Sequence, residues 1–162
     1  MYFLKYFFIT SILGFFLESI VCPFYESGIL YGPWTPVYGI GSIIILLISD
    51  RVLKDKSINV FLRFFLLFIS CFFVLSFIEL IGGLSIEKVF GISFWDYSNY
   101  RFNVGKYICL EISLVWGIIS ILFLFIRPFI DKVVSYIPNF FIYFLFFFFL
   151  VDVFFTFVFK RI

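Results

Sequence analysis

Residues 60–81 read VFLRFFLLFISCFFVLSFIELI, with Arg63 and Glu79 as the only charged side chains of the run. A helix needs about 20 apolar residues to cross a hydrocarbon core of about 30 Å, because each residue rises about 1.5 Å. The run is therefore long enough for one membrane span. Segments of similar length and character lie at Tyr2 to Val21, Tyr107 to Ile126 and Asn139 to Phe159, with a shorter one at Pro36 to Ser49. We predict an all-α, polytopic integral membrane protein with about five transmembrane helices.

The composition of the whole chain supports this class. Of its 162 residues, 64% are hydrophobic and 14% are charged, and Phe alone accounts for 30. Soluble domains carry about 25% charged residues and could not cover such a core with so little polar surface. We expect a single transmembrane domain over residues 1–162, with the lipid bilayer as its first partner.

The residue types that are missing exclude several kinds of chemistry. The chain has no His, which removes imidazole-based catalytic systems and the common zinc sites. Its three cysteines, Cys22, Cys71 and Cys109, share no CxxC spacing, and the net charge of +2 is scattered. We expect no metal, no cofactor and no nucleic-acid partner. For Cys22 and Cys109, apolar packing is favoured over a disulfide.

Two connections between the predicted spans are unusual. The stretch from Cys22 to Gly41 is rich in Pro and Gly, and Pro33 and Pro36 prevent a regular helix there. It carries no charge after Glu26, so we predict a re-entrant or broken segment before the second span.

The second connection, from Leu84 to Lys106, joins the third and fourth spans. It alternates charged and aromatic residues and includes Trp95, Asp96, Tyr97 and Asn103. Trp and Tyr favour the boundary between membrane and water, so we predict an amphipathic loop at that interface.

The orientation follows from the distribution of Lys and Arg. With five spans, seven of the 12 basic residues fall on the N-terminal side, concentrated between Arg51 and Arg63. Basic residues favour the cytoplasmic side, which predicts a cytoplasmic N-terminus in a bacterial inner membrane.

Four acidic residues lie inside or at the ends of the predicted spans: Glu18, Glu79, Glu111 and Asp152. An acid at the bilayer centre costs roughly 2.5–3.5 kcal/mol, so an intramembrane acid is by default a candidate functional residue. The five-span count places all four in the outer half of the membrane. The alternative is that the glutamates reach the interface or pair with Lys88, Arg101 or Lys106.

Helical spacing assigns faces to some of these acids. Glu18 continues a small and polar stripe through Ser11 and Gly14, and Glu79 continues one through Ser76 and Gly83. Glu111 points away from the small face of its own helix, whereas Asp152 lies four residues before Thr156 and eight before Lys160. We therefore expect Glu18 and Glu79 to face the interior.

Several short motifs occur in a characteristic order. They are Gly14-Phe-Phe-Leu-Glu18, Gly32-Pro33-Trp-Thr-Pro36-Val-Tyr38-Gly39, Glu79-Leu-Ile-Gly-Gly, Trp95-Asp96-Tyr97-Ser98, Asn103-x-Gly105 and Trp116-Gly117. This set resembles the CmpB-like family of small bacterial membrane proteins known as putative ABC transporter, type IV. The resemblance implies a permease subunit. The chain has no GxxxxGK[ST] phosphate loop, so a separate ATPase subunit would supply the energy.

These observations predict a bacterial transport component with a polar pocket for a substrate or ion, and a homo-oligomer is one expected assembly. The predicted pocket residues are Glu18, Glu79, Glu111, Asp96, Trp95, Tyr97, Tyr38 and Asn103, and the predicted structural loop is formed by Gly32, Pro33, Pro36 and Gly39. Two alternatives stay open. One is a membrane-embedded enzyme that uses Asp96, Glu18 or Glu79 as acid or base on lipid-linked substrates. The other is a structural or regulatory subunit without a ligand.

Overall fold

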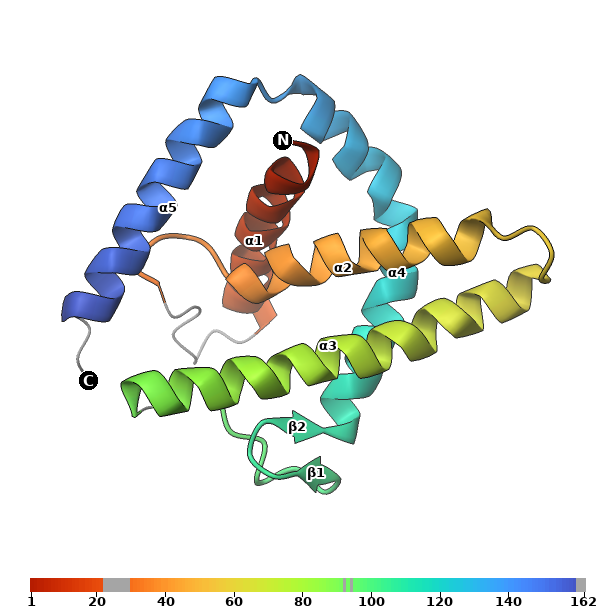
Figure 1. Cartoon of the computed structure of the whole chain (residues 1–162), viewed down its shortest axis with the longest axis horizontal. Helices are drawn as coiled ribbons and strands as arrows, with labels where there is room; N and C mark the ends of the chain where they lie inside the picture. The colour runs from red at the N-terminus through yellow and green to blue at the C-terminus, as the bar shows by residue number, and fades with distance from the viewer. Residues whose placement is uncertain (22–29, 92, 94, 160–162) are drawn as a thin grey trace. The chain divides into compact units, whose positions relative to one another are not determined.

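The computed structural model describes residues 1–21, 30–91, 93 and 95–159, and its fold is helical (Figure 1). The helices are α1 (Tyr2–Val21), α2 (Pro36–Lys54), α3 (Val60–Phe90), α4 (Leu110–Tyr136) and α5 (Asn139–Phe159). All five are long and apolar enough to cross a membrane, which confirms the predicted class and span number. Strands β1 (Asn103–Val104) and β2 (Ile108–Cys109) form a small antiparallel hairpin between α3 and α4.

Three helices differ in extent from the apolar runs in the sequence. The second continues beyond Ser49 to Lys54. The third continues beyond Ile81 to Phe90 and ends at Gly91, whose φ of 71° lets its backbone N–H donate to the carbonyl of Glu87 at 2.8 Å. The fourth begins at Leu110 instead of Tyr107, because the chain before it pairs as the β1–β2 hairpin, and it continues through Pro128 to Tyr136. Hydropathy finds the part of a helix that suits lipid, whereas capping and pairing determine where the helix ends.

The chain divides into two compact units. The terminal unit contains Met1–Ile43 and Ile126–Ile162, and the central unit contains Ile44–Phe125. Each is described by its own contacts below.

The core of the terminal unit is aromatic. Phe8, Leu30, Trp34 and Ile142 are buried together, with Phe149 among the side chains packed against them. The rings of Phe8 and Phe149 each approach Trp34 edge to face, with centroids 6.2 Å and 6.0 Å away. Such edge-on contacts add to the energy of burial. They join α1, the coil before α2 and α5 into one body.

A second set of contacts fastens the start of α1 to the end of α4. The carboxylate of Asp131 accepts hydrogen bonds from the hydroxyls of Tyr2 at 2.7 Å and Tyr6 at 2.6 Å. The ammonium of Lys5 donates to the carbonyl of Val134 at 3.3 Å. These polar contacts fix the N-terminal turn of the chain although its partners lie more than 100 residues away in sequence.

In the central unit, close packing depends on small residues. Gly83 of α3 lies directly against the ring of Tyr107, and Gly117 of α4 lies against Phe68 of α3. The hydroxyl of Ser76 donates to that of Ser113 at 2.6 Å, which links α3 to α4 within their buried faces. Small residues and hydroxyl pairs of this kind are how helices approach each other in lipid.

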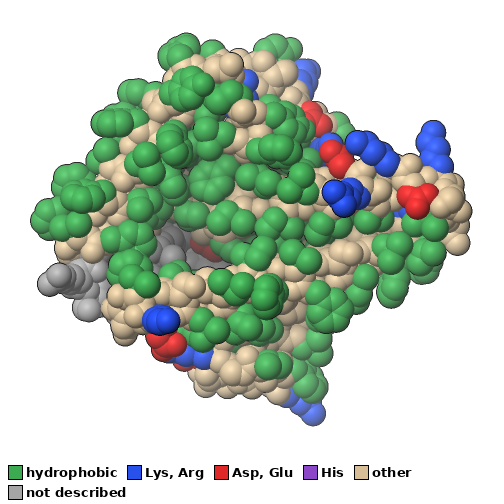
Figure 2. Space-filling view, viewed as in Figure 1, with side chains coloured by type: hydrophobic (Ala, Val, Ile, Leu, Met, Phe, Trp, Pro, Cys, Tyr) green, Lys and Arg blue, Asp and Glu red, His purple; other side chains and the backbone are tan. Residues whose placement is uncertain are grey.

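The surface is dominated by hydrophobic side chains. Figure 2 shows them over most of the visible face, with charged side chains gathered at a few places. Most phenylalanines of α5 are exposed, as expected for a helix that meets lipid. The predicted broken segment lies partly in residues 22–29, outside the described residues; Leu30–Thr35, which follow, are not helical.

Candidate functional site

Asp152 of α5 holds the coil that precedes α2. Its Oδ1 accepts from the backbone N–H of Tyr31 at 3.0 Å, and its Oδ2 accepts from the N–H of Gly32 at 2.7 Å and from the indole of Trp34 at 2.6 Å. One turn later on α5, the Thr156 hydroxyl also donates to Oδ1, at 3.2 Å. A carboxylate surrounded by N–H donors is a strong anchor because each bond is assisted by its charge. We call this arrangement the Asp152 anchor.

The Gly-Pro segment is shaped to fit this anchor. A Cβ added at Gly32 would collide with the indole of Trp34 and with Asp152 Oδ2, so only glycine allows the approach. The N–H of Thr35 donates to the carbonyl of Ser11 at 3.1 Å, and Pro36 then opens α2. Proline suits this first helical position, where its missing N–H costs nothing. Gly32 and Pro36 belong to the predicted structural loop, and that role stays a prediction.

Glu18 and Tyr38 lie in the same terminal unit. The half-buried carboxylate of Glu18 accepts from the Thr35 hydroxyl at 3.4 Å, a long hydrogen bond. The ring of Tyr38 packs directly on Gly14 of α1, and Gly39 packs on Ser11 and Phe7 in the same way. Tyr38 and Gly39 therefore help to seat α2 on α1.

Glu79 is the buried carboxylate of the central unit. It lies on α3 between the buried residues Ser76 and Gly83, with 8% of its surface exposed. The hydroxyl of Tyr97 donates to its Oε1 at 3.3 Å, and the indole of Trp116 on α4 also interacts with the carboxylate. Both partners are neutral, so the site combines a buried acid with aromatic hydrogen-bond donors.

The loop after α3 supplies Tyr97 to this site. Its backbone N–H donates to the carbonyl of Lys106 at 2.8 Å, which fixes the loop against the hairpin. Burial and the nearby charge of Glu79 raise the pKa of the Tyr97 phenol well above its ordinary value. Tyr97 therefore stays protonated and can donate its hydrogen bond across the physiological pH range.

Two more predicted residues add buried polar atoms to the central unit. Within the described part of the chain, neither Trp95 Nε1 nor Glu111 Oε2 has a hydrogen-bond partner, although both atoms are shielded from solvent. The ring of Trp95 lies edge-on to that of Tyr107, with centroids 5.7 Å apart. Buried polar atoms without a partner are costly, which makes them candidates for contact with a bound group or water.

Asp96 and Asn103 have local roles and do not join Glu79. Asp96 is exposed and accepts from the N–H of Ser98 at 2.8 Å, a hydrogen bond that lowers the pKa of the carboxyl. Asn103 is also exposed, and its side-chain amide donates to the carbonyl of Gly105 at 2.9 Å. Gly105 adopts a φ of 67° in the turn between β1 and β2. These residues shape turns of the hairpin loop.

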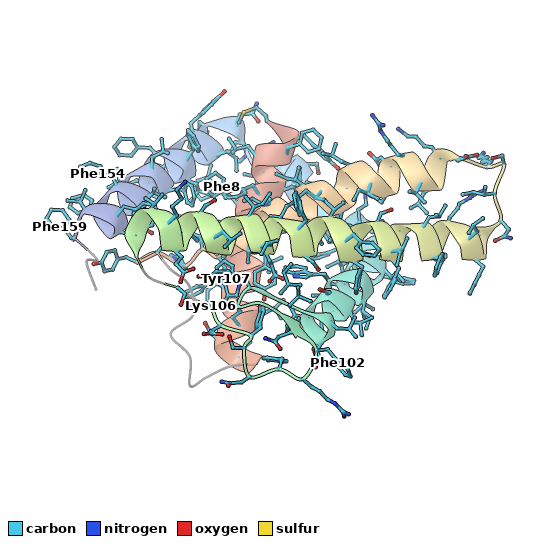
Figure 3. The ribbon with its side chains drawn as sticks, turned by 60° about the horizontal axis from the view of Figure 1, so that its bottom comes forward. Phe8, Phe102, Lys106, Tyr107, Phe154 and Phe159 are labelled. Carbon is cyan, nitrogen blue, oxygen red and sulfur yellow. The ribbon has the colours of Figure 1, made fainter. Side chains whose placement is uncertain are left out.

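The ion pair of this region belongs to Glu87. Lys106 Nζ lies 2.9 Å from Glu87 Oε1 and 5.5 Å from the centre of the Tyr107 ring, and Figure 3 shows Lys106 and Tyr107 side by side near α3. The sequence offers Lys106 as one possible ion-pair partner for the intramembrane glutamates. The structure pairs it with Glu87 at the end of α3 instead.

Several contacts of Asp152 and Glu79 were not predicted from the sequence. The N–H donors around Asp152 lie about 120 residues away along the chain, and the approach of Trp116 to Glu79 depends on the packing of α4 against α3. Trp116 belongs to a motif noted in the sequence, which was its only signal. In the described residues, no group of His, Cys, Asp and Glu side chains could hold a metal. Cys71 and Cys109 are free thiols, and Cys22 lies outside the described residues.

Comparison with known proteins gives one family. The family model ABC_trans_CmpB, described as Putative ABC-transporter type IV, matches residues 5–157 of the chain. No curated protein and no solved structure matches significantly.

Proposed function

The chain belongs to the ABC-transporter type IV family described above, and from this premise we propose that it is the membrane-spanning component of a bacterial transport system that binds a substrate or coupling ion at Glu79. The observation that carries the proposal is the buried Glu79 carboxylate in the middle of an apolar helix. Acids at such positions mark ion or substrate paths in membrane proteins.

The surroundings of Glu79 suit a ligand better than a permanent internal contact. Its hydrogen bond from Tyr97 is long, at 3.3 Å, and its neighbours donate without neutralising its charge. Trp95 and Glu111 of the same unit have further buried polar atoms available. A cation or amine would supply the missing positive charge, and transporters commonly use carboxylates for such groups.

Energy for transport would come from a partner. The chain contains no phosphate-binding GxxxxGK[ST] sequence, so ATP hydrolysis requires a separate subunit. We propose that this ATPase binds on the cytoplasmic side of an inner-membrane complex that contains one or more copies of the chain.

The first experiment identifies the partner. The tagged full chain is purified from its native membranes, and the proteins and lipids that accompany it are identified by mass spectrometry. A stoichiometric ATPase with measurable ATP hydrolysis supports the proposal. A bound lipid-linked intermediate would replace it with the membrane-enzyme alternative, and an unrelated membrane complex would replace it with the structural-subunit alternative.

The second experiment tests Glu79 within that complex. Glu79→Gln keeps the size of the side chain and removes its charge, so the ATPase should stay bound while its rate in proteoliposomes changes. The matched control is Glu87→Gln on the same helix, whose side chain is 42% exposed and lies at the ion pair with Lys106. An unchanged ATPase rate in Glu79→Gln would remove Glu79 from the proposal.

A further inference from the structure

The terminal unit contains a groove that the transport proposal does not use. Its volume is about 910 Å³, and it lies between α5 and the coil that the Asp152 anchor holds. Drug-sized ligands occupy cavities of about 300–1,000 Å³ that are mostly apolar with a few polar groups. The groove has these dimensions and this character.

Aromatic side chains form most of its wall. They are Tyr31, Trp34, Phe144, Phe148, Phe155 and Phe159. Phe148 precedes Asp152 by four residues and Phe155 follows it by three, so both lie on the same face of α5 as the carboxylate, one turn to either side. The faces of aromatic rings carry negative potential and attract cations.

The carboxylate in this wall has its hydrogen bonds satisfied by neutral donors of the described residues. Asp152 accepts from three N–H groups and one hydroxyl, which fills the four lone-pair positions that an ionised carboxylate offers. All four donors are neutral. Among the described residues, Lys106 forms an ion pair with Glu87 and Arg127 with Asp131, and no Lys or Arg contact is made to Asp152.

We propose that this groove binds a quaternary ammonium group that carries an alkyl chain. A quaternary ammonium has no N–H to donate, so it needs no free lone pair on Asp152 and is attracted through charge and through the ring faces alone. A primary amine would have to compete with the backbone donors for the same oxygens. The alkyl chain would lie along the phenylalanines of α5, where it buries apolar surface. The inference does not rest on the transport function.

The test is direct binding. Tritiated dodecyltrimethylammonium is bound to the immobilised full chain in dodecyl maltoside, a neutral detergent without an ammonium group, and is displaced by unlabelled dodecyltrimethylammonium or by neutral dodecanol. We expect saturable binding that the unlabelled cation displaces and that dodecanol displaces at least about tenfold less effectively, because dodecanol lacks the charge.

Variants locate the site. Phe148→Leu with Phe155→Leu removes two ring faces and keeps an apolar wall, and should weaken binding about five- to tenfold. The matched control is Phe147→Leu with Phe154→Leu, whose rings are each 61% exposed and do not line the groove; it should leave binding within about twofold of the wild type. Phe154 and Phe159 are labelled on the end of α5 in Figure 3. Asp152→Asn tests the charge, with its thermal unfolding measured alongside.

Two outcomes would overturn the proposal. If dodecanol displaces the label as well as the cation does, the groove is a site for acyl chains only. If the two double variants weaken binding equally, the cation binds elsewhere on the hydrophobic surface. Because neither double variant changes Asp152, both results can be read even if Asp152→Asn does not fold.

Discussion

Asp152 and Glu79 are both carboxylates inside apolar helices, yet they differ in the number and length of the hydrogen bonds that they accept. Asp152 in the terminal unit accepts four hydrogen bonds, three of them from N–H groups at 2.6–3.0 Å. Glu79 in the central unit is more buried, with 8% of its surface exposed, and has a long bond from a phenol and the nearby Trp116 indole. Short bonds from oriented N–H groups to a carboxylate are among the stronger hydrogen bonds in proteins.

The difference shows that depth in an apolar segment does not by itself identify a functional acid. The Asp152 anchor uses its carboxylate to shape the chain, and its oxygens are occupied. Glu79 has a long hydrogen bond from Tyr97 and the indole of Trp116 nearby, so its oxygens are less fully occupied by the described residues. The number and length of the hydrogen bonds around an intramembrane acid therefore distinguish a carboxylate whose oxygens are filled from one that can accept a further hydrogen bond, and hydropathy does not make this distinction.

The largest effect is expected for Asp152→Ala. It leaves the N–H groups of Tyr31 and Gly32 and the indole of Trp34 without their acceptor, and the terminal unit should lose on the order of 3 kcal/mol or more. Thermal unfolding in detergent measures the loss. Thr156→Val removes one weaker donor at 3.2 Å and should cost about 1 kcal/mol or less. Equal unfolding temperatures for Asp152→Ala and the wild type would show that the anchor is not structural.

The next effect comes from two neighbouring glycines of α3. Gly83→Ala places a methyl group against the ring of Tyr107 and should destabilise the central unit by about 1–3 kcal/mol. Gly82→Ala is the control, since its Cβ would meet only Trp95, at 3.8 Å. Because alanine favours a helix over glycine by about 1 kcal/mol, Gly82→Ala should be neutral or stabilising. If both substitutions changed the free energy of unfolding in the same direction, the hairpin loop would not be packed on α3 as described.

A smaller change in stability is expected for Glu79→Gln. The amide can still accept from Tyr97, and the loss of a buried charge offsets the weaker bond, so the free energy of unfolding should stay within about 1 kcal/mol of the wild type. The same thermal unfolding assay used for Asp152→Ala provides the comparison. A loss as large as that of Asp152→Ala would make Glu79 a second structural anchor and would abolish the contrast.

The smallest effect is expected for Lys106→Gln at the edge of the central unit. Its ion pair with Glu87 is partly exposed, and such pairs contribute little. The hydrogen bond to Glu87 raises the pKa of Lys106, so its contribution is complete below the ordinary lysine pKa and is lost as the pH rises through the raised value. Unfolding temperatures of the variant and the wild type should therefore differ slightly at neutral pH and converge in strong alkali. A wild-type advantage that grows with alkaline pH would contradict this assignment.

The predicted class and the number of helices follow from hydropathy because lipid imposes a length on each span. Helix ends are set by capping and by the pairing of the flanking chain. The extension of α3 to Phe90 depends on the left-handed conformation of Gly91, and the late start of α4 depends on pairing between Asn103 and Cys109. A glycine alone does not signal such an end, because Gly82 and Gly83 follow the apolar run directly and still lie inside α3. A two-residue strand likewise gives no usable pattern.

Only part of the candidate site could be predicted from the sequence. The spacing of Ser76, Glu79 and Gly83 places Glu79 on the buried face of α3, because that face repeats within one helix. The donors to Asp152 could not be inferred in the same way, since they come from a coil that meets α5 across about 120 residues of chain. Local periodicity reports which way a side chain faces and says nothing of a distant partner.

The Asp152 anchor also bears on how the protein is made. The terminal unit is assembled from the two ends of the chain, whereas the central unit is one continuous stretch, Ile44–Phe125. During synthesis the central unit is therefore complete in sequence before Asp152 has been added. The coil at Tyr31 and Gly32, although made early, must wait for almost the whole chain before its backbone N–H groups find their acceptor. Until then these N–H groups lack the Asp152 carboxylate, so we expect the interval before α5 inserts to be a vulnerable period of biogenesis.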